Sequence, residues 1–172
     1  MTNNVQKLKR KRLPEWLKTP LPKTNKFFQL KSLVQKYNLN TVCESASCPN
    51  IGTCWDAGTL TFMILGDSCS RACKFCDVAT GNLIAPNPYE PKRIAETLSK
   101  LNLRYAVITS VDRDDLIDGG AEHWIKTIQL IRIQCPEMKI ETLIPDFQGK
   151  TSLVEKICEA KPDVLAHNLE TV

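Results

Sequence analysis

The sequence lacks long hydrophobic runs. No stretch approaches the roughly 18 consecutive apolar residues that a membrane-spanning helix needs. The first twenty residues are rich in Lys and Pro and lack the apolar segment of a secretory signal. We therefore predict a protein with no membrane partner, located in the cytoplasm, with an organelle as the alternative.

The basic N-terminal part lacks interleaved aromatic residues. Ten Lys and Arg residues stand against Glu15 alone in residues 1–36, so the remainder of the chain carries a negative excess. Proteins that bind single-stranded nucleic acid place aromatic rings among their basic residues as stacking platforms, and "KLKRKR" has none. We predict a solvated, partly disordered terminus or a docking surface for an acidic partner, and no binding of nucleic acid.

Cysteine, in contrast, is abundant. The chain has 172 residues, of which 42% are hydrophobic and 24% charged, so it can bury one core of ordinary domain size. Small secreted proteins use disulfides because they lack such a core. Eight cysteines in a longer chain without an export signal favour metal binding, with disulfides as the alternative.

Hydrophobic patterning predicts an α/β fold. Three prolines make residues 12–24 an extended segment, and a helical period follows from Phe27 to Tyr37, with Asn25 available as its N-cap. The segment "TVCESASCPNIGTCW" has the composition of a loop. Strands are then expected at 59–66, 104–110, 138–144 and 163–167, and helices at about 90–101, 121–134 and 150–160.

The alternation of strands and helices indicates parallel strands joined by right-handed crossovers. Four strands and three helices do not close a barrel, so we expect an unfinished sheet. Ligands of parallel sheets bind beyond the carboxyl ends of the strands. The polar segments that follow the strands, which include "SVDRDDLIDGGAEH", "PDFQG" and "HNLET", should therefore converge at one mouth.

The segment "DSCSRACKFCDV" carries three thiols, Cys69, Cys73 and Cys76, in a C-x3-C-x2-C pattern. A structural zinc site takes four ligands and normally pairs two C-x2-C knuckles, and the only imidazoles are those of His123 and His167. Three thiolates on one loop instead suit three corners of a [4Fe–4S] cluster. One iron then stays open to a small ligand.

The motif "CSRACKFC", with Phe75 before the third Cys and a strand before the loop, resembles the signature of the radical S-adenosylmethionine (SAM) enzymes. The resemblance implies a cluster held by these three cysteines, whose open iron is chelated by the methionine moiety of SAM. It also implies reductive cleavage of SAM to a 5′-deoxyadenosyl radical, which abstracts hydrogen from an unactivated C–H bond.

A second triplet, Cys43, Cys48 and Cys54 in "CESASCPNIGTCW", resembles the auxiliary-cluster motif of the lipoyl synthase family. A zinc-stabilised loop is the alternative. Similarity to that family extends from about residue 12 to the end through "PEWLK", "NTVCESA", "VITSVDRDDL", "DGGAEHW", "PDFQG" and "HNLET". It implies two [4Fe–4S] clusters and SAM, with the auxiliary cluster consumed as the sulfur donor.

That resemblance implies an enzyme that inserts sulfur at C6 and C8 of a protein-bound octanoyl chain to form the lipoyl cofactor. Its partners would be octanoylated lipoyl carrier domains or H protein, and an electron donor such as ferredoxin or flavodoxin. Two other hypotheses stay open. One is another radical SAM sulfur-insertion enzyme, similar to biotin synthase, and the other is a non-catalytic metal-binding module that docks a lipoyl carrier.

Several polar residues are predicted to bind SAM. "TSVDRDDL" stands at a strand end, where its side chains suit the charged methionine moiety and the ribose, or form a capped turn. "HNLET" is similar to ribose-contacting segments of related sulfur-insertion enzymes. His167 is expected to pack in the core, and Cys135 and Cys158 to be buried thiols. The predicted SAM-binding residues are Phe75, Ser110, Asp112, Arg113, Asp115, Asn168 and Glu170.

The sequence is also shorter than the lipoyl synthase resemblance implies. That family has further βα units and a serine near its C-terminus that completes the auxiliary cluster, and neither falls within the 172 residues. We predict an N-terminal extension with the auxiliary cluster loop at 1–58, followed by a partial, truncated (β/α) radical-SAM barrel at 59–172. The substrate channel of such a chain would lack a wall.

Overall fold

The computed structural model describes residues 14–15, 18–101 and 103–169. Its strands are β1 (Asn40–Thr41), β2 (Thr61–Ile64), β3 (Tyr105–Ser110), β4 (Lys139–Leu143) and β5 (Val164–Ala166). Its helices are α1 (Asn25–Lys36), α2 (Val42–Ser45), α3 (Ile51–Ala57), α4 (Glu90–Leu101), α5 (Ala121–Gln134) and α6 (Thr151–Glu159), with a 3-10 turn, η2 (Phe147–Gly149). The predicted strands and helices after residue 59 are therefore confirmed.

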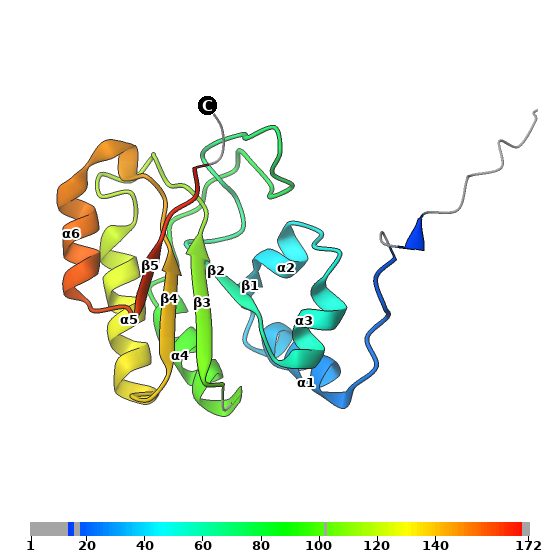
Figure 1. Cartoon of the computed structure of the whole chain (residues 1–172). Coiled ribbons are helices and arrows are strands. Elements are labelled where there is room, and N and C mark those ends of the chain that lie inside the picture. Colours follow the sequence, from blue (N-terminus) through cyan, green and yellow to red (C-terminus); the bar gives the residue numbers. More distant parts are fainter. Residues whose placement is uncertain (1–13, 16–17, 102, 170–172) are drawn as a thin grey trace, which may run out of the picture.

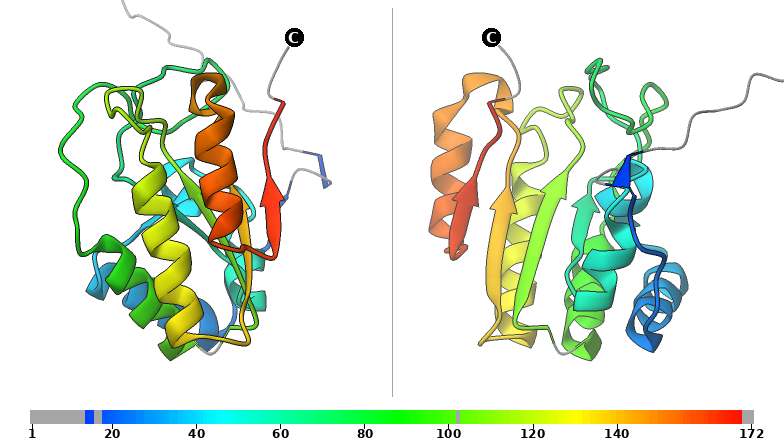
Figure 2. Two further views of the ribbon diagram at one scale, coloured as in Figure 1. Left: turned by 90° about the vertical axis from the view of Figure 1, so that its left-hand side faces the viewer. Right: turned by 45° about the vertical axis from the view of Figure 1, so that its right-hand side comes forward.

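The strands form one sheet in the order β1-β2-β3-β4-β5, in which β2 to β5 are parallel. Helices α4, α5 and α6 lie against one face of this sheet, and the carboxyl ends of the parallel strands point to one edge (Figures 1 and 2). The predicted α/β class and parallel sheet are confirmed.

The core lies between the sheet and its helices. Ile64, Ile108 and Ile140, one from each central strand, are fully buried. Helix α5 contributes Trp124 and Ile128, which are four residues apart and so share one side of the helix. Side chains alternate along a strand, so the residues directly before and after each of these isoleucines in its strand face the other side of the sheet.

One strand and two helices were not predicted. β1 pairs antiparallel with β2, and two residues are too few to give a recognisable period. The expected loop at 41–55 instead contains α2 and α3, so that prediction was wrong. Thr41 caps α2 by accepting the N–H of Glu44, and Gly58, at φ 80°, ends α3 in the left-handed conformation.

The N-terminal segment is tied to α3 by one carboxylate. Asp56 accepts the backbone N–H groups of Lys23 (3.0 Å) and Thr24 (3.2 Å) and the hydroxyl of Thr24 (2.6 Å). Thr24 is the N-cap of α1, and Asn25 is the first residue of that helix, so the predicted cap at Asn25 was wrong. Residues 18–24 contain no helix or strand, as expected for the extended segment.

The predicted burial of two cysteines is not borne out. Cys158 is exposed because α6 turns the neighbouring Ile157 toward the core, and Cys135 is only half-buried at the end of α5. All eight cysteines lie in described residues and are free thiols. The boundary at residue 58 stays a prediction. Most of the basic N-terminal run lies outside the described residues, among which no helix is long and apolar enough to cross a bilayer.

Candidate functional site

A cavity of about 700 Å³ lies at the carboxyl ends of the strands. Met63, Thr109 and Leu143, paired in register on β2, β3 and β4, line it from the sheet face opposite α4 and α5. Its walls come from α2, from the loop after β2, and from the residues that follow β3, β4 and β5. The predicted convergence of the polar segments at one mouth is therefore confirmed.

The loop after β2 carries the C-x3-C-x2-C motif across this cavity. Cys69, Cys73 and Cys76 all line it, with Cys69 half-buried and the other two exposed. The N–H of Cys69 donates to the Ala79 carbonyl at 2.8 Å, and the N–H of Cys76 donates to the Cys73 carbonyl at 3.0 Å. Bonds within the loop therefore fix its path and leave the thiols on the cavity side.

The sulfur of Cys69 accepts hydrogen bonds from two backbone N–H groups. Its Sγ accepts the N–H of Arg71 at 3.4 Å and the N–H of Asp112 at 3.3 Å, and the thiol lies 3.7 Å from Asp112 Oδ2. Burial raises the pKa of the Cys69 thiol, and the two N–H groups oppose that rise by favouring the thiolate. Such donors suit a metal-bound thiolate, because metal ligation requires the deprotonated form.

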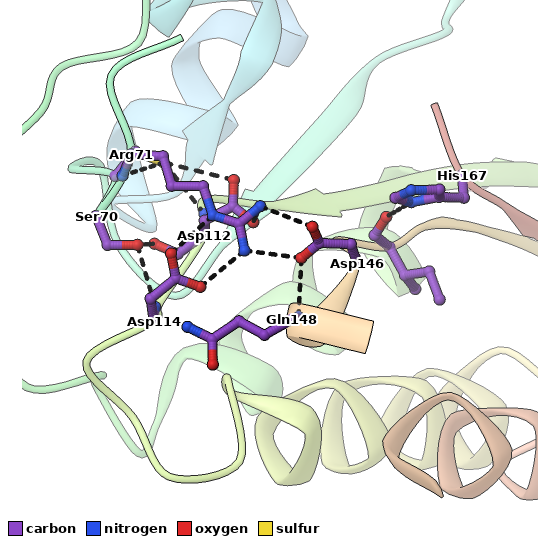
Figure 3. Close-up of polar contacts among 9 residues, drawn as sticks. Ser70, Arg71, Asp112, Asp114, Asp146, Gln148 and His167 are labelled. Atoms are coloured by element: carbon purple, nitrogen blue, oxygen red, sulfur yellow. Dashed lines mark hydrogen bonds and ion pairs between the residues drawn. The ribbon is translucent and has the colours of Figure 1, made fainter. Parts of the chain in front are cut away.

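Arg71, between the first two cysteines, joins the loop to the ends of β3 and β4 (Figure 3). Its guanidinium donates to both oxygens of Asp114 (2.7 and 2.8 Å) and to both oxygens of Asp146 (3.0 and 2.7 Å). Asp112 Oδ1 lies 3.6 Å away. Bidentate pairing is the strongest geometry available to arginine and carboxylate, so it fixes the position of the loop relative to the sheet.

Ser70 adds uncharged contacts to the same junction. Its N–H and its hydroxyl both donate to the carbonyl of Asp112 at 3.0 Å, and its Oγ accepts the N–H of Asp114 at 3.1 Å (Figure 3). The segment after β3 is therefore held to the cysteine loop through backbone groups as well as through Arg71.

The pKa values of the carboxylates around Arg71 are shifted in different directions. Hydrogen bonds from Arg71 lower the pKa of Asp114, and those from Arg71 and from the Gln148 N–H lower the pKa of Asp146 to about 2. Burial raises the pKa of Asp112 and outweighs the opposing charge of Arg71. Asp114 and Asp146 are thus held ionised by Arg71. Asp112 lines the cavity, and the charge of Arg71 only partly offsets the cost of burying its carboxylate.

Four of the predicted SAM-binding residues, Phe75, Ser110, Asp112 and Asn168, line the cavity. The Ser110 hydroxyl is buried without a hydrogen-bond partner, and the Phe75 ring is 61% exposed. A buried polar group without a partner is costly, and a bound ligand could satisfy this one.

Two other predicted SAM contacts, Arg113 and Asp115, are not among the described residues that line the cavity. Arg113, which is only 3% exposed, donates to both oxygens of Asp115 (2.9 and 2.8 Å) and to the Leu65 carbonyl (3.0 Å). Glu170 lies outside the described residues. The SAM-binding roles of these residues stay predictions.

The position of His167 and the role of Arg71 differ from what the sequence predicted. His167 was expected in the core, but it is exposed at the cavity, where its Nδ1 donates to the Ile144 carbonyl at 2.8 Å, so that prediction was wrong. Sequence reasoning also missed Arg71. The only signal was a cation inside the cysteine motif with three carboxylates in segments expected at the same mouth.

The second triplet lies beside the cavity. Cys43 is in α2, Cys54 is in α3 and Cys48 is between them, and all three are half-buried. None of them lines the cavity, although Val42 and Ala46 from the same segment do. Within the described ranges, no three His, Cys, Asp or Glu side chains gather as ligands of a single metal ion. A cubane cluster differs, because each thiolate binds its own iron.

Comparison with known families gives two matches that divide the chain. Residues 2–48 match the N-terminal domain of lipoyl synthase of the radical SAM family, and residues 63–172 match the radical SAM superfamily. That superfamily implies a [4Fe–4S] cluster and SAM. The second match covers the cysteine loop, β3, β4 and β5, which together form most of the cavity.

Curated relatives agree with these matches. The chain is 52% identical to lipoyl synthase of Natronomonas pharaonis over 167 residues, which is 95% of this chain and 54% of that protein. It is 53% identical to lipoyl synthase of Thermus thermophilus over 162 residues (92% and 50%) and to that of Neisseria gonorrhoeae over 167 residues (96% and 50%). The chain spans about half the length of these relatives and corresponds to their N-terminal part. It belongs to the radical SAM superfamily, and its sequence is similar to the N-terminal half of lipoyl synthases.

Proposed function

We propose that the polypeptide containing these residues inserts sulfur at C6 and C8 of an octanoyl chain on a carrier protein, forming the lipoyl cofactor. The observation that carries the proposal is a three-thiol loop that opens onto a cavity at the carboxyl edge of the sheet, in a chain about half identical to lipoyl synthases. A saturated carbon has neither a leaving group nor an acidic proton, so side-chain acid–base chemistry alone cannot functionalise it.

Cys69, Cys73 and Cys76 are proposed to hold the [4Fe–4S] cluster. The fit is supported by their common position on the cavity and by the two N–H groups directed at Cys69 Sγ. Among the described residues no other cysteine lines the cavity, which supports one iron left open for SAM. When bound, the cluster supplies the electron for cleavage of SAM.

SAM is proposed to occupy the rest of the cavity. The unpartnered Ser110 hydroxyl and the Asp112 carboxylate suit its charged methionine moiety, and Asn168 suits its ribose hydroxyls. The exposed Phe75 ring offers an apolar contact beside the loop. These side chains would orient the cosubstrate and exclude water from it. The SAM contacts of Arg113, Asp115 and Glu170 stay predictions from the sequence.

Cys43, Cys48 and Cys54 are proposed to hold a second [4Fe–4S] cluster, which serves as the sulfur source. The supporting observation is the position of α2, whose Val42 borders the cavity one residue before Cys43. A sulfur donor there lies beside the cavity proposed for the first cluster and SAM. The division into an extension at 1–58 and a barrel part at 59–172 follows from this assignment.

The proposed partners follow from the same reaction. The substrate is an octanoylated lipoyl carrier domain or H protein, and the reductant is a small electron donor such as ferredoxin or flavodoxin. The carrier must present its octanoyl chain at the mouth formed by the loops after β2 and β4. A cytoplasmic location stays a prediction.

Iron and sulfide analysis of anaerobically reconstituted protein tests the proposal. About eight irons per chain are expected for two cubane clusters. Cys73→Ala should abolish SAM cleavage, whereas Cys48→Ala should keep SAM cleavage and lose sulfur insertion, with insertion measured in the full-length polypeptide. Cys158→Ala, which changes an exposed thiol on α6, is the matched control and should retain both activities.

Other outcomes identify the alternative functions. About four irons, all lost in Cys73→Ala, would remove the auxiliary role of the second triplet and favour a different radical SAM enzyme, such as one similar to biotin synthase. Zinc without sulfide would indicate a non-catalytic metal-binding module. Equal loss of both activities in Cys73→Ala and Cys48→Ala would contradict separate roles for the two triplets.

A further inference from the structure

We infer that Arg113 and Glu90 are positioning residues that hold Leu65 in a left-handed backbone conformation and thereby direct the cysteine loop. Leu65 immediately follows β2 and precedes Cys69 by four residues. The inference rests on the proposed role of the loop as a cluster site, and it assigns Arg113 a task other than contact with SAM.

The backbone of Leu65 is in a region that its side chain disfavours. Its φ is 71°, and Gly66 follows with a φ of 103°. A positive φ brings Cβ close to the following carbonyl oxygen, so for a bulky residue other than glycine such a conformation persists only where its surroundings enforce it. Two successive positive φ values turn the chain away from the strand direction and into the loop.

Both backbone groups of Leu65 are bound by buried charged side chains. Its N–H donates to Glu90 Oε2 at 2.8 Å, and its carbonyl accepts from Arg113 Nη1 at 3.0 Å. Glu90 is 9% exposed and Arg113 is 3% exposed. Charge-assisted bonds of this kind are stronger than neutral ones, and they act here on both sides of one residue.

Each of the two side chains is itself fixed by a partner. Glu90 Oε2 lies 2.7 Å from His123 Nε2, which comes from α5, and the Arg113 guanidinium is held by both oxygens of Asp115. Neither Glu90 nor Arg113 lines the cavity. Their common neighbour is Leu65 rather than the space proposed for SAM.

The Leu65 side chain also packs in a buried space beside Gly120. It is 1% exposed, and a Cβ added at Gly120 would overlap its Cδ1. Glycine at position 120 therefore leaves room for the leucine as well as adopting its own φ of 87°. Packing and hydrogen bonding thus select the same conformation of Leu65.

Hydrogen exchange of the cluster-free chain tests this positioning directly. Arg113→Met and Glu90→Met each remove one of the two bonds to Leu65, and we expect exchange of the Cys69 and Ser70 amides to accelerate about tenfold in both. Amides of β4 should keep their protection. Arg132→Met is the matched control, because it also removes an arginine that donates to a backbone carbonyl. That carbonyl, of Met138, lies before β4 at the amino end of the strand, so exchange of the Cys69 and Ser70 amides should not change.

Conservative variants separate the hydrogen bonds from general packing. Glu90→Gln keeps a side-chain carbonyl that can accept the Leu65 N–H, and Arg113→Lys keeps a donor for its carbonyl. Both should recover most of the lost protection. If Arg113→Met does not fold, comparison of Glu90→Met with Glu90→Gln decides the matter, and equal exchange of the loop in those two variants would overturn the inference.

SAM titration of reconstituted protein, followed by the spectrum of the cluster, distinguishes positioning from direct contact. Positioning predicts that Arg113→Met and Glu90→Met weaken SAM binding alike, by about tenfold, which is about 1.4 kcal/mol. Loss in Arg113→Met alone would mean direct contact and overturn the inference. Failure of every variant, the unsubstituted chain included, to form a cluster would reject the proposed function, and the exchange experiment would still stand.

Discussion

The two cysteine triplets are held by different forces. The helix that carries Cys54 is anchored by Trp55, which is fully buried and packs against Phe27 with the ring centroids 5.4 Å apart. The loop that carries Cys69 is anchored by the Arg71 ion-pair network and by the Leu65 backbone. One triplet thus depends on apolar burial and the other on directed polar contacts.

This difference follows from what surrounds each triplet. Apolar burial is strong but not directional, and it suits short helices that lie on the core. The Cys69 loop must leave Cys73 and Cys76 exposed at a cavity, so it has little apolar surface to bury. Directed bonds from Arg71 can fix such a loop while its thiols stay accessible.

Trp55→Ala should have the largest effect on this comparison. Removing a fully buried indole leaves a cavity, and we expect the free energy of unfolding to fall by about 3–5 kcal/mol. Denaturant unfolding measures the loss. Phe28→Ala is the control, because Phe28 is 59% exposed and a substitution there should cost less than about 1 kcal/mol. Equal costs would contradict the anchoring role of Trp55.

Arg71→Gln should have a smaller effect on stability and a local one on structure. The Arg71 side chain is 30% exposed, so solvent screening limits the loss to about 1 kcal/mol. Exchange of the Ser70 amide should accelerate, while amides of α3 stay protected. Lys74→Gln removes an exposed cation from the same loop and is the control. Acceleration in α3 as well would show that the two anchors are not independent.

The sequence predicted those parts of the fold that repeat a local period. β3 and α5 were found because "RYAVITS" is rich in β-branched residues and "AEHWIKTIQLIRIQ" places apolar residues at helical spacing. The cysteine motifs were found for the same reason, since their spacing is local. The two-residue strand β1 and the short helix α2 offer no such period.

The sequence predicted that the segments after the strands converge, but not which of their side chains pair. Arg71 and Asp146 are 75 residues apart, and only the folded sheet brings the ends of β2 and β4 to the same edge. Arg113 was predicted to contact SAM because it follows a strand. Its side chain instead reaches the Leu65 carbonyl, which pattern alone does not reveal.

Asp56→Ala tests whether the N-terminal segment supports the triplet of Cys43, Cys48 and Cys54. Asp56 follows Trp55 in α3 and binds the backbone of Lys23 and Thr24, so its loss should release residues 18–24 from the helix. We expect faster exchange of those two amides and a slight decrease in Tm. Asp56→Asn, which keeps one carbonyl acceptor, should lie between. Unchanged exchange in Asp56→Ala would mean that packing of the prolines holds the segment.

Asp146→Asn should have the smallest effect, and it is visible mainly as a dependence on pH. The folded pKa of Asp146, about 2, lies below its ordinary value near 4, so the ionised form is favoured by folding. Its contribution is complete above about pH 4 and is lost as the pH falls through 2. The stability difference between the two proteins should therefore shrink over that window.

Urea unfolding at a series of pH values measures that difference. The Asp146 side chain is 46% exposed, so we expect less than about 1 kcal/mol at neutral pH, and still less in high salt. Asp146→Asn would keep a side-chain carbonyl that can accept the Gln148 N–H at the start of η2. The lost stability therefore measures the ion pair with Arg71 rather than that hydrogen bond. A difference that stays constant from pH 2 to 7 would show that the charge of Asp146 does not hold the Cys69 loop. The contrast with the apolar anchor of the helix that carries Cys54 would then rest on Asp114, Ser70 and the Leu65 backbone.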